Sequence, residues 1–470
     1  MNCTNCYQEY KVTSIEYKCP NCGSLLLFKS DLSKFKEGFS KNKKFLSFWD
    51  FYFTLPPIKK EFIITLNEGG SPCRESKRIG KNIGLNRLFF KDETLNPTNS
   101  FKDRAAALLI SHARSWGYQK VVCASNGNQG ASIAAYTSLE GMECINIIPK
   151  RIDIGKHAQL IAYNSKIITK GDTIDDIIDL ALEPNYSKEY YQCTPEFNPL
   201  TIEAQKTMSF EIFQDIGTPD WIIVPMGDGG CLVSIWKGFN ELYECNLIKN
   251  LPKIVGVQTQ ACSPIVDKFF NEPFNKNNDR VTIESRATSI LVKKPIYQNL
   301  AIKAMSESKG TALAAPESLI LSSVSDLAKY EGIFAEPASA STLAALMMLK
   351  DHYNLGSDEI VVCLITGSGL KAPYVLEAFS RAKTAGMGGI LSTKLKILSQ
   401  INLFDSKGIH GTRLKEIIGN VSLPAIYQHL KELELKSLVS RKKEGKRVLY
   451  FITEQGKKVL DAMDILITLL

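Results

Sequence analysis

The sequence carries one lysine whose surroundings suit imine chemistry. Lys102 follows a segment in which Pro97 and Asn99 favour a turn, and an alanine-rich run begins at Ala105. This order predicts a helix that begins beside the lysine, so that its amine faces a loop. A lysine amine held in this way can form an imine and then accept or give a proton. For a lone lysine the alternative is an ordinary solvated side chain, because most lysines lie on the surface.

Three glycine-containing loops favour the chemical interpretation, because each follows an apolar run that predicts a buried strand. The runs and their loops are, in chain order, 121–124 with 125–132, 221–225 with 226–231, and 360–365 with 366–371. Glycines let the backbone approach an anion closely, and helix N-termini add the positive end of their dipole. One such loop is weak evidence, but three of them after a helix-start lysine indicate a site that holds a phosphate.

These motifs together resemble those of the threonine synthases, in the pyridoxal phosphate enzyme superfamily that tryptophan synthase β typifies. The similarity covers about residues 1–385 and rests on the segments 68–72, 96–104, 125–132, 225–238, 256–258 and 366–371. It implies an α/β body of fold type II (tryptophan synthase β-like), in which two lobes enclose the cofactor, pyridoxal 5'-phosphate. Strands that alternate with helical patterns agree with such a body.

The resemblance also implies a role for each site residue. Lys102 would hold the cofactor as an internal aldimine, and Asn128 would hydrogen-bond its ring hydroxyl. Thr366 would face the pyridine nitrogen, while Ser125 and Asn126 would bind the carboxylate of the amino-acid substrate. The cup for the cofactor phosphate corresponds to Gly227, Asp228, Gly229, Gly230 and Cys231. Because asparagine is usual at the position of Asp228, we expect its backbone amide, not its carboxylate, to bind.

The activity implied is that of a threonine synthase, a lyase that converts O-phosphohomoserine and water to threonine and phosphate. A second departure from the family bears on this activity, since Thr201 stands where an arginine usually holds the substrate phosphate. Threonine cannot replace that charge, and Glu196 would repel a phosphate if it faced the pocket. Lys150, Arg151 and Lys156 are candidates to replace the arginine. The alternatives are a threonine or serine dehydratase, a β-replacing enzyme, or a transcriptional regulator built on the same fold.

The N-terminus carries a separate signal, formed by two CxxC pairs with twelve residues between them. The pairs are Cys3 with Cys6 and Cys19 with Cys22. Four thiolates at this spacing can close a tetrahedron around zinc and staple a segment too short for a core of its own. The sequence therefore predicts a structural zinc ribbon. A redox pair or disulfides are the alternatives for the same spacing.

The composition is that of an ordinary globular enzyme. Of the 470 residues, 44% are hydrophobic and 23% are charged, which suits about three domains. We see neither a signal peptide nor an apolar run of membrane length, and the other eight cysteines are scattered singly. We therefore expect a cytoplasmic protein without a membrane partner, and we expect it to be a homodimer.

The domain organisation follows from these patterns. We expect the zinc ribbon at 1–30 and the catalytic body at 31–385, with a small lobe of about 105–210 inserted into a larger one. A glycine-containing linker at 386–391 then leads to a module that resembles a winged helix-turn-helix at 392–470. The expected elements of this module are helices at 392–404, 413–418 and 424–435, strands at 437–443 and 447–452, and a last helix from about 453 to 470.

The net positive charge of the chain is concentrated in this last module. Residues 390–470 hold 14 Lys and Arg against 8 Asp and Glu, which is a surplus of 6 in a chain whose net charge is +8. The expected wing carries Arg441, Lys442, Lys443, Lys446 and Arg447. These residues suit phosphate contacts, and Tyr427 and Gln428 on the third helix could reach a major groove, so DNA is a candidate partner of 392–470. The alternative is a dimerisation or effector-sensing module with a solvated basic hairpin.

Overall fold

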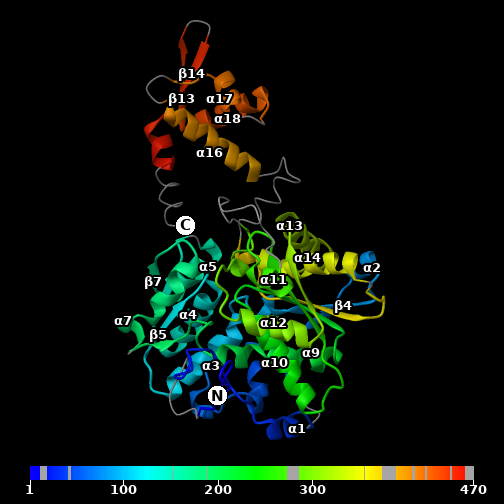
Figure 1. Ribbon diagram of the computed structural model, residues 1–470. Coiled ribbons are helices and arrows are strands. Elements are labelled where there is room, and N and C mark those ends of the chain that lie inside the picture. The colour runs from blue at the N-terminus through cyan, green and yellow to red at the C-terminus, as the bar shows by residue number, and fades with distance from the viewer. Residues whose placement is uncertain are drawn as a thin grey trace. The chain divides into compact units, whose positions relative to one another are not determined.

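The computed structural model describes the chain except residues 11–17, 41–43, 151, 188, 272–284, 354, 373–387, 405–407, 419–420, 445–446 and 461–470. It divides into two compact units, Met1–Val375 and Leu376–Leu470. Each is drawn in Figure 1, and each is described by itself below.

The first unit is built on two sheets of buried strands. The larger sheet has the order β11 (Thr311–Ala315), β10 (Lys253–Thr259), β9 (Trp221–Pro225), β12 (Ile360–Ile365), β4 (Arg87–Asp92) and β3 (Cys73–Glu75). Only β3 runs antiparallel to its neighbour in this sheet. The smaller sheet is parallel, with the order β7 (Lys166–Thr169), β6 (Glu143–Ile148), β5 (Lys120–Ala124) and β8 (Tyr191–Gln192). All four of its strands lie between β4 and β9 in the sequence.

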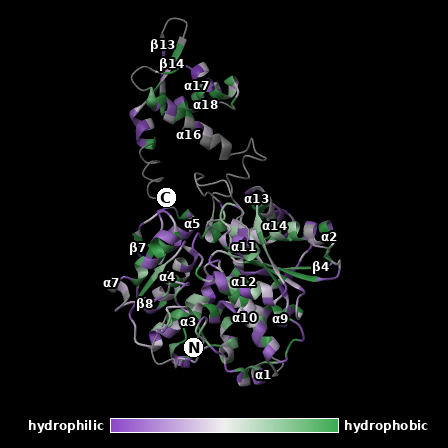
Figure 2. Ribbon diagram, in the orientation of Figure 1, coloured by the Kyte–Doolittle hydropathy of each residue, from purple (hydrophilic) through white to green (hydrophobic). Residues whose placement is uncertain are grey.

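Helices connect the strands, as parallel pairing requires. They show hydrophobic and hydrophilic residues side by side in Figure 2, which is the pattern of helices that cover a sheet. In chain order they are α1 (Leu32–Ser40), α2 (Ile79–Ile83), α3 (Lys102–Ser115), α4 (Asn128–Glu140), α5 (Ile154–Ala162), α6 (Ile174–Ile177), α7 (Pro184–Ser187), α8 (Leu200–Gln205), α9 (Thr207–Ile216), α10 (Gly230–Glu244), α11 (Pro264–Phe270), α12 (Gln298–Glu307), α13 (Glu317–Asp326) and α14 (Pro337–His352). No helix within the described ranges is both long and apolar enough to cross a bilayer.

Three of the predicted strands end at loops that matter for the site. The strands β5, β9 and β12 end at Ala124, Pro225 and Ile365. Since β9 and β12 are parallel neighbours, their carboxyl ends meet at one edge of the larger sheet. The backbone amide of Phe101 donates to the carbonyl of Thr366 (3.0 Å), which ties the start of α3 to the same edge.

The N-terminal segment of this unit is a small ribbon. Its strands β1 (Asn2–Cys3) and β2 (Leu26–Leu27) pair antiparallel. Met1, Cys3, Cys19 and Leu26 form its buried cluster, which is far too small to stabilise a domain by itself. A cross-link between the four cysteines would therefore stabilise the fold of the ribbon.

The second unit contains α16 (Gly388–Leu403), α17 (Gly411–Ile418), α18 (Leu423–Leu435) and the antiparallel pair β13 (Val439–Glu444) and β14 (Arg447–Ile452). Residues 454–460 are also helical, and the rest of the predicted last helix lies outside the described residues. Ile426, Leu430 and Leu433 are buried on one face of α18, as the sequence pattern predicts. The first helix begins at Gly388, so part of the segment expected as a linker is helical.

Candidate functional site

The structure brings the predicted site residues of the first unit together in one pocket, which we call the inner pocket. Lys102, Ser125, Asn126, Asn128, Gly227, Asp228, Cys231 and Thr366 all line it. Gly229 and Gly230 are not lining residues, but Gly229 lies in the same loop after β9 and Gly230 is the first residue of α10. Residues from both sheets therefore surround Lys102.

Lys102 is the first residue of α3, as predicted. The turn before it is fixed by the buried Asp103, whose carboxylate accepts hydrogen bonds from the backbone amide (2.7 Å) and the hydroxyl (2.6 Å) of Thr98. The amine of Lys102 lies 4.8 Å from the centroid of the Phe101 ring. A buried acid thus positions the turn, while an aromatic ring flanks the amine.

Asn128 begins α4, and its side chain lies in a polar network that the sequence did not reveal. Its Nδ2 donates to Glu336 Oε1 (3.0 Å), and Lys156 Nζ lies 3.5 Å from the other oxygen of Glu336. The Oδ1 atom of Asn128 is buried and has no hydrogen-bond partner among the described residues. Glu336 precedes Pro337 at the start of α14. An acidic residue followed by proline is typical of a helix start, and this was the one sequence signal that pointed to Glu336.

The loop between β9 and α10 needs its glycines. A Cβ atom at Gly227 would lie 3.1 Å from the Ser289 carbonyl oxygen, and Gly229 has a φ of +98°. The amide of Gly230 donates to Oδ1 of Asp228 (3.3 Å), so the aspartate carboxylate folds back over the loop. A compact glycine loop before a helix start is the geometry that cradles a phosphate.

Thr366 follows β12 directly, with its hydroxyl in the pocket wall. Its Oγ1 lies 2.9 Å from Oγ of Ser339 on α14, so the two hydroxyls form a pair. Ser125, just after the end of β5, accepts hydrogen bonds from the amides of Gly127 (3.1 Å) and Gly130 (3.0 Å). These bonds hold the loop that would bind a substrate carboxylate.

Taken together, these groups fit the cofactor that the resemblance implies. The unpartnered oxygen of Asn128 belongs to a residue that lines a pocket with a lysine amine, a glycine cradle and a hydroxyl pair. Buried polar atoms rarely lack a partner, so an orphaned oxygen at a pocket points to a ligand that satisfies it.

Two acidic residues line this pocket in addition to Glu336. Glu196 is buried, and burial, followed by the charge of Asp228, raises the pKa of its carboxyl to about 8. Burial also raises the pKa of Asp228 above its ordinary value. The Glu196 carboxylate does face the pocket, which was the condition under which we expected it to repel a phosphate.

The two described candidates to replace the usual arginine, Lys150 and Lys156, already pair with carboxylates. Lys156 is 1% exposed and lies 2.6 Å from Asp153 Oδ2, so carboxylates already engage it. The exposed Lys150 lies 3.7 Å from Asp172, and Arg151 lies outside the described residues. Thr201, in α8, is buried, and its hydroxyl has no partner among the described residues.

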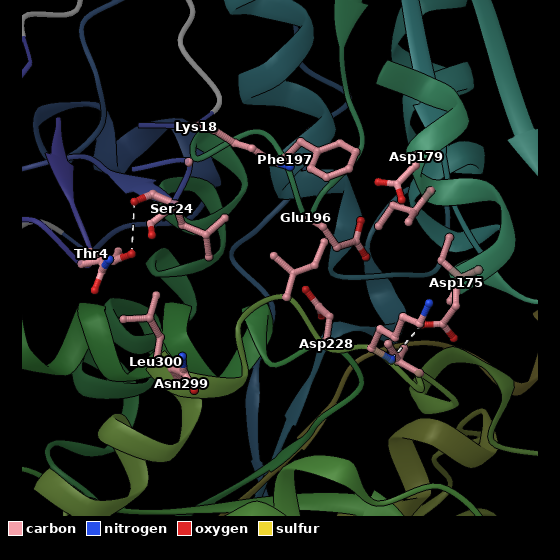
Figure 3. A pocket seen from close by; sticks show the side chains of 18 residues that line it. Thr4, Lys18, Ser24, Asp175, Asp179, Glu196, Phe197, Asp228, Asn299 and Leu300 are labelled. Carbon is pink, nitrogen blue, oxygen red and sulfur yellow. Dashed lines mark hydrogen bonds between the residues drawn. The ribbon is translucent and has the colours of Figure 1, made fainter. Parts of the chain in front are cut away.

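A second, larger space adjoins the inner pocket, and we call it the outer cavity. Its volume is about 670 Å³, and it shares Ile174, Glu196, Asp228 and Val292 with the inner pocket. Figure 3 shows Glu196 and Asp228 near its middle, with Thr4, Ser24 and Lys18 of the ribbon on one side and Asp175 and Asp179 on the other. The N-terminal ribbon therefore forms one wall of the approach to Lys102.

The four predicted zinc ligands also come together. The sulfur atoms of Cys3, Cys6, Cys19 and Cys22 all lie within 4.8 Å of one another, and no cysteine of the chain is in a disulfide. The Sγ atoms of Cys3 and Cys22 are 3.4 Å apart, and those of Cys6 and Cys19 are 3.6 Å apart. Tetrahedral zinc with Zn–S bonds of about 2.3 Å separates its sulfurs by roughly 3.8 Å, so the cluster suits that metal.

The second unit exposes the residues that we predicted as candidates for DNA contact. Tyr427 and Gln428 lie on the exposed side of α18, opposite its buried face. Arg441, Lys442 and Lys443 are exposed on β13, whereas Lys446 lies outside the described residues. A basic strand beside an exposed helix surface matches a wing and a recognition helix.

Comparisons with known proteins agree with this geometry. The model of the family "Pyridoxal-phosphate dependent enzyme" matches residues 64–367, and that of the HxlR-like helix-turn-helix matches residues 390–469. The chain is 36% identical to the threonine synthase of Methanocaldococcus jannaschii over 382 residues, which are 79% of this chain and 92% of that protein. It is 37% identical to the threonine synthase of Mycobacterium tuberculosis over 312 residues, which are 66% of this chain and 84% of that protein.

Solved structures show a similar fold at lower identity. Maize serine racemase has a TM-score of 0.54 and 19% identity, and the match covers 66% of this chain and 92% of that one. A threonine deaminase from T.th. has a TM-score of 0.52 and 21% identity, with coverage of 63% and 92%. The predicted fold class is confirmed by these likenesses and by the two family matches.

Proposed function

The chain belongs to the pyridoxal-phosphate dependent enzymes and, among them, to the threonine synthases, and from this premise we propose how its residues act. The reaction converts O-phosphohomoserine and water to threonine and phosphate. The observation that carries the proposal is the convergence of Lys102, Asn128, the glycine loop and Thr366 in one pocket.

Bound pyridoxal phosphate supplies an electron sink for the carbon atoms of the substrate. Lys102 provides the amine that holds the cofactor and, once released, moves a proton at the α-carbon. The loop from Gly227 to Cys231 would hold the cofactor phosphate, and Asn128 would contact the ring hydroxyl with the oxygen that has no partner among the described residues. Thr366 would offer a hydroxyl to the ring nitrogen, which suits elimination and replacement better than transamination.

Substrate binding falls to the loop after β5 and to the pocket walls. Ser125 and Asn126 hold the α-carboxylate, with the loop kept in place by the hydrogen bonds that Ser125 accepts. A related lyase that needs no phosphate subsite is the second candidate. It is favoured by the neutral side chain of Thr201, whose hydroxyl has no partner among the described residues.

Lys102→Ala tests the cofactor attachment. We expect the purified protein to lose the absorbance of the attached cofactor, because no other amine replaces this one. Borohydride reduction followed by peptide mass mapping should label Lys102 in the unmodified chain. Lys77→Ala, which removes an exposed lysine, is the control and should keep both signals.

Product analysis separates the candidate reactions. The cofactor-loaded protein is incubated separately with O-phosphohomoserine, threonine and serine. Release of phosphate together with threonine supports the synthase. Formation of keto acid from threonine or serine supports the dehydratase. If none of the three amino acids reacts, the result supports the regulator.

We also infer a structural zinc ion at Cys3, Cys6, Cys19 and Cys22, supported by the closeness of their sulfur atoms. The twelve free cysteines suit a reducing compartment, which favours the cytoplasm. For the second unit we propose DNA binding through α18 and β13, supported by the helix-turn-helix match and the exposed basic residues.

For the catalytic unit we propose that two copies of the chain form a homodimer.

A further inference from the structure

Two carboxylates lie where the inner pocket meets the outer cavity. Glu196 and Asp228 line both the inner pocket beside Lys102 and the outer cavity. The acids come from different segments, since Glu196 follows β8 and Asp228 follows β9. An amino acid whose carboxylate is held by Ser125 and Asn126 beside Lys102 would therefore lie near both acids.

One carboxylate oxygen of the buried Glu196 lacks a hydrogen-bond partner among the described residues. Only 9% of the residue is exposed, and its Oε2 atom has no hydrogen bond from any described residue. Figure 3 shows this carboxylate directed into the cavity. A buried carboxylate is costly unless it is neutralised or paired, so an unpaired one at a ligand site points to a cationic or hydrogen-bonding ligand group.

The surrounding charges favour a cation over a phosphate. Lys102 is the only basic side chain of the described residues that lines the inner pocket, and the cofactor engages its amine. In the outer cavity, Lys18 and Lys294 are exposed, and Lys18 lies 5.3 Å from the centroid of the Phe197 ring. Thr201 adds no charge. Among the described residues, a phosphate dianion there would meet the buried Glu196 and the half-buried Asp228, because the buried Lys156 is already paired with Asp153 and Glu336.

We propose that this site also binds α-amino acids whose side chain ends in a protonated amine, with that ammonium group held between Glu196 and Asp228. The inference goes beyond threonine formation, and it rests on the proposed cofactor site at Lys102. Such diamino acids would compete with O-phosphohomoserine for the same pocket. Charge-assisted hydrogen bonds from the ammonium would satisfy the free oxygen of Glu196.

Titration of the cofactor-loaded full chain tests this proposal. Absorbance of the bound cofactor and calorimetry are followed with L-2,4-diaminobutyrate and L-ornithine, and with the neutral L-norvaline and L-homoserine as references. We expect at least one diamino acid to bind at least tenfold more tightly than L-norvaline. Equal affinities, or tighter binding of the neutral amino acids, would overturn the proposal.

Matched variants assign the effect to the buried acid. Glu196→Gln keeps the size of the side chain and removes its charge, so the preference for diamino acids should fall at least tenfold. At a pH above the Glu196 pKa of about 8, the KM for O-phosphohomoserine should fall with the same substitution, because a repulsive charge is gone. Asp179→Asn removes an exposed acid from the rim of the same cavity and should change the preference less than twofold.

The outcomes separate this proposal from the function on which it rests. Phosphate and threonine release without any diamino-acid preference leaves the synthase intact and overturns only the acidic subsite. A preference that survives in Glu196→Gln also overturns it. If no amino acid changes the absorbance of the cofactor or gives a heat of binding, that result contradicts the cofactor site itself, and the acidic subsite with it.

Discussion

At the scale of single residues, acidic side chains dominate the charge of the inner pocket. Glu196 and Glu336 are buried and Asp228 is half-buried, while Lys102 is the only basic side chain of the described residues that lines it. The raised pKa of Glu196 follows from burial and from the charge of Asp228, while Lys102 acts in the opposite direction. Under the proposed ammonium subsite, the protonation state of Glu196 would decide how well a cationic side chain binds.

The pH dependence of binding follows from that glutamate. Its carboxyl must be ionised to pair with an ammonium group, and ionisation requires a pH above its pKa of about 8. The charged groups that face it are Asp228, Lys102 and Asp175. We expect the affinity ratio of L-2,4-diaminobutyrate to L-norvaline to rise severalfold from about pH 6.5 to about pH 8.5, since a lysine-like amine titrates near 10. Calorimetry on the unmodified chain and on Glu196→Gln measures the ratio, which should be nearly flat in the variant.

Glu336 is a second residue whose role follows from its contacts. It accepts a hydrogen bond from Asn128 Nδ2 and lies 3.5 Å from Lys156, so it fixes the direction in which the asparagine oxygen points. We expect Glu336→Gln to move the absorbance maximum of the bound cofactor while the cofactor remains attached. A spectrum unchanged from that of the unmodified chain would contradict this positioning role.

At the scale of elements, a buried ion network fastens the helix that carries Lys102. Arg104 of α3 lies 2.8 Å from Glu93 and 2.6 Å from Glu211 of α9, and Lys91 of β4 lies 2.6 Å from Glu211. Burial opposes the charge of Glu211, but Arg104 and Lys91 outweigh it and lower its pKa to about 2. The network thus joins α3, α9 and β4 behind the pocket.

Glu211→Gln should destabilise the first unit, because it leaves Glu93 as the one carboxylate of this network beside two buried cations, Lys91 and Arg104. The expected loss is about 3–5 kcal/mol in the free energy of unfolding, measured by denaturant titration. In the unmodified chain, the stability from ionised Glu211 is present above its unfolded pKa near 4.5 and is lost as the pH falls toward about 2. Glu61→Gln, at an exposed site, should leave the midpoint unchanged.

Local sequence patterns predicted the elements of the site well. The start of α3 at Lys102, the strands β5, β9 and β12, and the buried face of α18 all follow from turn residues and apolar periodicity. The contact between Asn128 and Glu336 did not, because it joins residues 208 positions apart. The burial and unpaired state of Glu196 likewise depend on packing between distant segments.

At the scale of the whole molecule, the ribbon brings four cysteines together and contributes to the outer cavity. We expect about one zinc ion per chain by elemental mass spectrometry, and its loss in Cys6→Ser. Without the metal the small core of the ribbon cannot hold its fold, so proteolysis should cut the N-terminal ribbon selectively. Cys73→Ser, outside the cluster, is the control and should keep the metal.

Binding of DNA by the full chain belongs to the same scale. A mobility-shift assay at low salt, with a pool of genomic duplexes, should show retention that weakens steeply as salt is added. Replacing Arg441, Lys442 and Lys443 by alanine should lower the slope of log K against log salt by up to about 3, at about 0.9 per phosphate contact. An equal slope after removal of exposed Lys60, Lys77 and Lys81 is the expected control result. Absence of any retention would favour a module for dimerisation or effector sensing.

The wall that the ribbon gives to the outer cavity has a consequence for engineering. Thr4, Asn5, Lys18, Ser24 and Leu25 border the substrate approach, yet none of them belongs to the strand-end loops around Lys102. A chimera that receives its N-terminal ribbon from a homologue would exchange the entrance and spare the catalytic machinery. Substrate selectivity could then be changed by exchanging the ribbon, without any substitution in the interior of the catalytic unit.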